Sequence, residues 1–215
     1  MNRFLHLPQE GANQAKKALE IFEQIGDIGK QGNCLVALAC ALNWDNQFDA
    51  AEEAASRAIQ LLPEKGEEYT VCQSHRILGD VHSRKAEREK AIHHFETAFR
   101  IASSFNWNEQ LFWIHYRLAE LFCNERGFDN AHVQIQQAKL HAVDNAYNLA
   151  RAVELQARVY FRQCRFEDAT SEGLRALEIY EKLGNLSDAK DCRDLLQDAE
   201  GNMKHRDAPM VSFRG

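Results

Sequence analysis

The chain has 215 residues and a formal net charge of −6, with only three prolines and 11 glycines to interrupt helices. An acidic chain gives no reason to expect a nucleic-acid partner, because phosphates attract basic faces. No apolar run reaches the roughly 18 residues of a membrane span, and the first residues lack a signal-peptide pattern. We therefore expect a cytoplasmic, all-helical protein that binds no membrane.

The first predicted helix covers residues 12–25 and follows a lead-in at 1–11 that contains Pro8 and Gly11. Its apolar stripe consists of Ala15, Ala18, Leu19, Phe22 and Ile25. ALEIFEQIGDIGKQGNC at 18–34 aligns with ALEIYEKLGNLSDAKDC at 176–192, which makes this helix the second helix of a unit without its first helix. Two interpretations follow: the chain is a piece of a longer array, or this helix serves as a cap. A stripe left uncovered by the lead-in favours self-association through this helix.

Four helix hairpins are predicted next, at about 30–62, 67–104, 108–142 and 146–183. Ala51, Ala91 and Ala131 are 40 residues apart, and Ala169 follows after a further 38. The facing positions on the first helices keep the same step and are also small: Ala39, Gly79, Ala119 and Ala157. Small residues on both helices allow a close crossing, and a period of this length predicts a solenoid of stacked units.

The last predicted helix, at 186–199, places Ala189, Cys192, Leu195, Leu196 and Ala199 inward and a polar face outward, as a terminal capping helix requires. Residues 201–215 show no period and are expected to be disordered. The predicted organisation is an array over 12–200, with a half repeat at 12–29, repeats at 30–66, 67–107, 108–145 and 146–184, and a cap at 185–200.

These patterns resemble the tetratricopeptide repeat. A small residue on each first helix is followed one turn later by a larger one (Leu42, His82, Phe122, Tyr160). The clearest second helix reads Ala91-x-x-x-Phe95-x-x-Ala98, and Pro63 closes the first complete unit. The period exceeds the usual 34 or so residues, which resembles the kinesin light chain variety. The resemblance implies a right-handed α-solenoid that acts as a non-catalytic protein-interaction scaffold without a cofactor.

The last unit is also similar to arrays that follow the nucleotide-binding domain of fungal innate-immunity-type signalling ATPases of the NACHT or NB-ARC kind. The similar stretches are AYNLARAVELQARVYFRQCRFEDA, RALEIYEKLG and DAKDCRDLL. This resemblance implies an alternative function, a sensor or oligomerisation segment whose catalytic domain lies outside the chain.

Few residues indicate chemistry. The stretch Gly26-Asp27-Ile28-Gly29-Lys30 lacks the spacing of a phosphate loop. Cys72, His75 and His82 share a helical face, as metal ligands could, but His75 and His82 occupy the inward positions of Leu35 and Leu42 in the previous unit. We therefore predict packed histidines, reduced cysteines, no metal and no enzyme.

A partner-binding surface remains, on the first helices opposite the core stripe. Its predicted residues are Arg76, Asp80, Arg84, Trp113, Tyr116, Glu120, Arg151, Arg158 and Arg162. With Glu154, five arginines face three acids, which predicts attraction of an acidic or aromatic-bearing peptide or protein. Arg158 and Arg162 would bind carboxylates, and Trp113 and Tyr116 would be the apolar anchor.

The alternative for this face is a solvated surface of intrahelical ion pairs, Arg76 with Asp80 and Glu154 with Arg158. The Lys-x-x-Gly-Asn pattern with which some tetratricopeptide proteins bind a terminal carboxylate is absent, because Arg76 and Asp80 occupy the matching places. We do not expect that class of partner.

Overall fold

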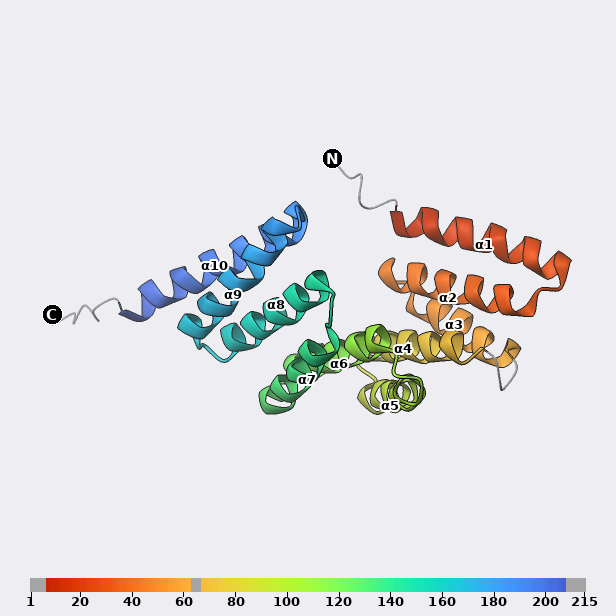
Figure 1. Cartoon of the computed structure of the whole chain (residues 1–215), viewed down its shortest axis with the longest axis horizontal. Helices are drawn as coiled ribbons and strands as arrows, with labels where there is room; N and C mark the ends of the chain where they lie inside the picture. Colours follow the sequence, from red (N-terminus) through yellow and green to blue (C-terminus); the bar gives the residue numbers. More distant parts are fainter. Residues whose placement is uncertain (1–6, 63–66, 208–215) are drawn as a thin grey trace, which may run out of the picture. The chain divides into compact units, whose positions relative to one another are not determined.

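The computed structural model describes residues 7–62 and 67–207, and within these ranges the chain folds into ten helices and no strand (Figure 1). The helices are α1 (Leu7–Ile25), α2 (Ile28–Trp44), α3 (Phe48–Leu61), α4 (Glu68–Arg84), α5 (Arg88–Ser104), α6 (Asn108–Asn124), α7 (Phe128–His141), α8 (Ala146–Arg162), α9 (Phe166–Lys182) and α10 (Leu186–Asp207). The chain forms two compact units, Met1–Ile114 and His115–Gly215, which we describe separately.

The helices are joined by a turn that recurs through the chain. At the end of α4, the N–H of Ala86 donates to the carbonyl of Ser83 at 3.1 Å and that of Glu87 donates to His82 at 2.8 Å. This is the Schellman arrangement, and it requires a left-handed residue, here Ala86 with φ 59°. Glu87 then serves as the N-cap position of α5, so three residues suffice to reverse the chain.

Among the described residues the same left-handed position recurs at steps of 18–20 residues, apart from one step of 40 that spans the connection between α3 and α4. It is occupied by Gly26, Asn46, Ala86, Asn106, Arg126, Asp144, Cys164 and Gly184. Only two of these eight residues are glycines, although glycine adopts this conformation most easily. The hairpin period of 40 therefore consists of two steps of 20, each a helix followed by a turn. The third hairpin is two residues shorter because its second step, α7 with the connection to α8, has 18 residues.

The helix crossings are built from small residues, as the sequence predicted. Ala51, Ala91, Ala131 and Ala169 are at most 1% exposed, and so are their facing residues Ala39, Ala119 and Ala157. A Cβ added to Gly79 would lie 2.6 Å from the ring of Phe95, so that ring packs directly on the α4 backbone. The expected all-α class of stacked antiparallel hairpins is confirmed.

The first unit begins earlier than the sequence indicated. Helix α1 starts at Leu7, so residues 7–11 are helical where a lead-in was expected, while residues 1–6 lie outside the described part of the chain. Ala15 and Leu19 are buried against α2, so these two residues are not the open edge that we considered. Ile25, assigned to the inward stripe, is instead 66% exposed.

The second unit ends in α10, whose inward face is confirmed. Ala189, Cys192 and Ala199 are fully buried against the preceding helices. The helix continues to Asp207, so residues 201–207 are helical rather than disordered, and 208–215 lie outside the described residues. One glycine, Gly201, costs a helix only about 1 kcal/mol and does not end it.

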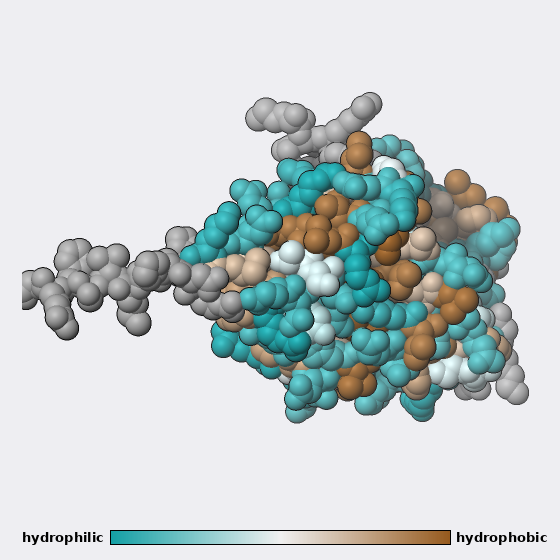
Figure 2. Space-filling view, turned by 60° about the vertical axis from the view of Figure 1, so that its left-hand side comes forward, coloured by the Kyte–Doolittle hydropathy of each residue, from teal (hydrophilic) through white to brown (hydrophobic). Residues whose placement is uncertain are grey.

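The visible surface is mostly hydrophilic, with apolar side chains spread between polar ones (Figure 2). Among the described residues, no helix is both long enough and apolar enough to cross a membrane.

The turn geometry yields a first prediction. Ala86→Gly should raise the free energy of unfolding by about 0.5–1 kcal/mol, because removing Cβ relieves the left-handed conformation. Gly184→Ala is the reverse change at a position where an added Cβ meets nothing within 4 Å, and it should lower stability by a similar amount. Urea unfolding measures both; a destabilised Ala86→Gly protein would contradict the role assigned to this turn.

The crossings yield a second prediction. Ala91 is fully buried, so Ala91→Leu should overpack the α4–α5 contact and cost about 1–3 kcal/mol. Glu96→Leu, at an exposed position of the same helix, should change the free energy of unfolding by no more than about 0.5 kcal/mol. Equal melting temperatures for Ala91→Leu and wild type would show that the crossing tolerates bulk.

Candidate binding surfaces

In the first unit, Arg84 stands at the exposed end of α4 and reaches back to the end of α2. Its guanidinium donates to the backbone and side-chain oxygens of Asn43 and to the side chain of Asn46. It also lies over the ring of Phe48, 4.8 Å from the centroid. Every acceptor found for Arg84 among the described residues is neutral, so its charge is not cancelled by a carboxylate.

Arg76 is held more tightly. Its Nε donates to Gln110 at 3.2 Å, and its guanidinium lies 3.9 Å from Asp80, with both side chains largely buried. Gln110 in turn donates to the hydroxyl of Tyr69, whose ring packs edge-on against Trp107 at 5.0 Å. Arg76 and Asp80 are therefore parts of a packed polar network rather than open binding groups.

Trp113 also belongs to the first unit and is half-buried, with its ring at an angle of 77° to that of Phe112. The Trp113 side chain is therefore still partly exposed, as the predicted role of apolar anchor requires.

In the second unit, Tyr116 is only 1% exposed, so it cannot be the exposed anchor that the sequence suggested. Its hydroxyl oxygen accepts from Arg151 at 3.3 Å and from Arg158 at 3.1 Å. Burial, with a contribution from Glu120, raises the pKa of Tyr116, so the phenol is neutral at ordinary pH. Tyr116 positions two guanidinium groups rather than contacting a ligand.

Two glutamates balance part of this arginine cluster. Arg158 lies 3.4 Å from Glu120 and 3.7 Å from Glu154, and Arg117 binds Glu120 at 2.8 Å. Glu154 also accepts from the hydroxyl of Tyr180. Both intrahelical pairs considered from the sequence, Arg76–Asp80 and Glu154–Arg158, are thus present.

Arg162 is the last residue of α8, as Arg84 is of α4, and its environment is similar. It is exposed and donates to Asn124 at 2.9 Å, with Cys123 sulfur at 3.8 Å. Its partners among the described residues are again neutral. We define the arginine surface of the second unit as Arg117, Arg151, Arg158 and Arg162; against Glu120 and Glu154, four positive and two negative charges leave +2.

Tyr147, an aromatic partner of Arg151, was not singled out in the sequence, and neither was its counterpart Tyr69 two repeats earlier. Tyr69 and Tyr147 stand at the second residue of α4 and α8, 78 residues or two repeats apart. Tyr147 is half-exposed, and its hydroxyl accepts from Arg151 at 3.2 Å. Aligning polar positions by the repeat, as was done for the core, would have identified this pair.

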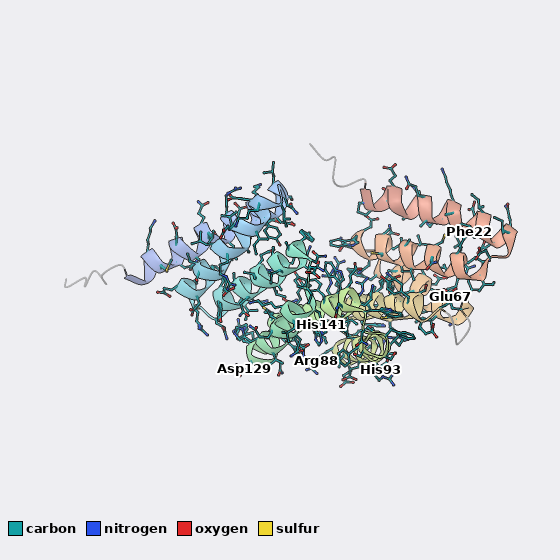
Figure 3. The ribbon with its side chains drawn as sticks, viewed as in Figure 1. Phe22, Glu67, Arg88, His93, Asp129 and His141 are labelled. Atoms are coloured by element: carbon teal, nitrogen blue, oxygen red, sulfur yellow. The ribbon has the colours of Figure 1, made fainter. Side chains whose placement is uncertain are left out.

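His75 and His82 are packed, as predicted, and they belong to a histidine cluster between α4 and α5. The Nδ1 atoms of His75 and His94 are 3.0 Å apart, and His94 stacks on His82 with ring centroids at 5.2 Å. His82 also bonds Glu87 at 2.7 Å. His93, labelled in Figure 3, lies beside His94 on α5. No group of three potential ligands among the described residues has the geometry of a metal site.

The cysteines are free thiols that differ in burial. Cys72, Cys123 and Cys192 are buried, and burial raises the pKa of Cys72 to about 11. Cys164 is exposed in the turn before α9, and Cys34 and Cys40 are half-buried.

The histidine cluster yields a third prediction. Burial, assisted by His75, His82 and His93, lowers the pKa of His94 to about 4, and burial also lowers that of His75. Because the unfolded chain then takes up protons first, stability should fall as pH decreases from about 6.5 toward 4. The His75→Phe/His94→Phe double variant should show a flatter profile in urea unfolding between these values. An unchanged profile would contradict the assignment.

Comparisons with known proteins show similarity in fold rather than in sequence. No protein-family model matches the chain, and no curated protein matches it. Among solved structures, BtubC (BKLC) from P. vanneervenii aligns with a TM-score of 0.66 at 17% identity, over 92% of each chain.

Two Rap structures are similar as well. A Rap protein complexed with Competence and Sporulation Factor aligns with a TM-score of 0.65 at 15% identity, over 94% of this chain and 61% of the Rap chain. The apo form of RapI aligns with a TM-score of 0.60 at 16% identity, over 94% and 80% of the two chains. At these identities the similarity establishes the fold, that of helical repeat proteins of the tetratricopeptide type.

Proposed function

We propose that this chain is a non-catalytic protein-interaction scaffold, and that its second unit binds an acidic segment of a partner at the arginine surface. The observation that carries the proposal is the state of Arg162, an exposed guanidinium whose hydrogen bonds go to neutral groups on a chain that is acidic overall. Charged donors already held in place bind carboxylates with less loss of side-chain entropy than flexible ones do.

The surface supplies the geometry for this role. Arg158 and Arg162 are one turn apart on α8, so two carboxylates of an extended segment could be bound by neighbouring guanidinium groups. Tyr147, half-exposed beside Arg151, offers an aromatic ring next to the charges, a role that the buried Tyr116 cannot fill. Among the similar folds, a Rap protein holds a bound factor, which supports binding as a use of this architecture.

A fourth prediction tests the proposal. The probe is a fluorescein-labelled glutamate-rich peptide with one tryptophan, and binding is followed by anisotropy at low and at physiological salt. Arg162→Glu should weaken binding by about tenfold or more, since a charge-assisted hydrogen bond contributes about 1.5–3 kcal/mol. Adding Arg158→Glu should abolish it.

The matched control is Lys190→Glu/Arg193→Glu, which makes the same change in net charge on the exposed face of α10. Circular dichroism should be the same for both double variants. Retained affinity in the Arg158/Arg162 variant, or equal losses in the control, would refute a specific role for the arginine surface.

A further inference from the structure

The C-terminal half of α1 resembles that of α9 in sequence. The stretch ALEIFEQIGDI from Ala18 repeats as ALEIYEKLGNL from Ala176. In this alignment Ala18 corresponds to Ala176 and Phe22 to Tyr180. The second unit therefore shows which surroundings this helix sequence has when both of its neighbours are present.

In the second unit the centre of this face, Ala176 and Tyr180, is fully covered, whereas Leu183, the counterpart of Ile25, is 47% exposed there as well. Ala176 and Tyr180 are 0% exposed and share a core cluster with Ala150 and Val153 of α8. The Tyr180 hydroxyl donates to Glu154 of α8 at 2.9 Å, and a Cβ added at Gly173 would lie 4.0 Å from that of Ala157. One helix with small and β-branched residues three and four positions apart covers the centre of the face.

In the first unit the corresponding face of α1 keeps access to solvent. Helix α2 buries Ala12, Ala15 and Leu19, which form one edge of the apolar arc. The rest of the arc, which we name the open face of α1, consists of Ala18, Ile21, Phe22 and Ile25, whereas Gly11 faces Ala41 of α2. Ile21 and Ile25 are 54% and 66% exposed, and Ala18 and Phe22 are only partly buried (Phe22 is labelled in Figure 3). The apolar arc of α1 is thus wider than α2 covers.

We infer that the open face of α1 docks an amphipathic helix of a partner protein, one that presents an apolar stripe like that of α8. The stripe has small or β-branched residues at i, i+3 and i+7, as in Ala150, Val153 and Ala157. The site lies on another unit than the arginine surface and does not depend on it.

The chemistry of Phe22 refines this partner. Tyr180 donates its hydroxyl to Glu154, but Phe22 has no hydroxyl, so a carboxylate opposite Phe22 would be buried without a hydrogen bond. The docked helix should therefore carry an apolar residue at the position of Glu154. This requirement separates the expected partner from a simple copy of α8.

The size of the face favours one helix over a second copy of the chain. Its four residues are far fewer than the roughly 20–30 residues that each side of a stable protein–protein interface contributes. A symmetric α1 pair centred on Ala18 would also place Gln14 opposite Phe22, burying an amide that now donates to Glu10.

The test uses the full chain and a labelled, stapled helical peptide with the sequence of residues 146–162 carrying Glu154→Leu. Anisotropy should show saturable binding, with at least a tenfold loss in the Ile21→Glu/Ile25→Glu variant, whose changes fall at exposed positions and leave folding intact. The matched control, Asn13→Glu/Gln24→Glu, adds the same charge on the opposite exposed side of α1 and should bind as wild type does.

Three results would overturn the inference. One is the absence of saturable binding at millimolar peptide, and another is binding that survives Ile21→Glu/Ile25→Glu, which would place the peptide elsewhere. The third is a dimer in light scattering that Ile25→Glu disperses, which would assign the face to a second copy. Binding should persist in the Arg158→Glu/Arg162→Glu variant, so failure here and failure of the arginine surface are separable.

Discussion

The close approach of small residues at each helix crossing is the constraint on which the rest of the structure depends. Ala91 on α5 is fully buried, and the bare backbone at Gly79 leaves room for the ring of Phe95. Because interiors are close-packed, a larger residue at such a crossing separates the pair and displaces the neighbouring hairpin. The position of every side chain on the outer surface of the first helices, including Arg158 and Arg162, follows from this spacing.

The arginines connect successive first helices, and we propose that two of them also take part in recognition. Arg84 and Arg162 reach from one first helix to the end of the previous one, which fixes the guanidinium groups in place. Their acceptors are neutral amides and carbonyls, so the positive charge remains available to an incoming anion. Arg76 shows the contrasting case, because Asp80 and Gln110 surround it and leave little of it exposed.

The core could be predicted from the sequence because one alanine position recurs at each repeat, and a repeat shows the packing several times over. The turns could not, because Ala86, Arg126 and Cys164 give no sign of a left-handed conformation where glycine would have done so. The burial of Tyr116 was missed for a related reason: helical spacing assigns a face, whereas the reach of Arg151 and Arg158 from the next hairpin decides what covers it. The partial burial of α1 was missed as well, because it depends on how much of the apolar arc of α1 a single neighbouring helix can cover.

The three-residue connections have a consequence for how such a chain can change its length. Each residue advances a helix by about 100°, so one inserted or deleted in the turn around Ala86 would rotate the face of α5 away from α4. Insertions are therefore tolerated only where a connection is longer, as between α3 and α4 or between α7 and α8. The left-handed residues thus fix the spacing between successive helices. Related chains should differ in length at those two connections and keep the 20-residue step elsewhere.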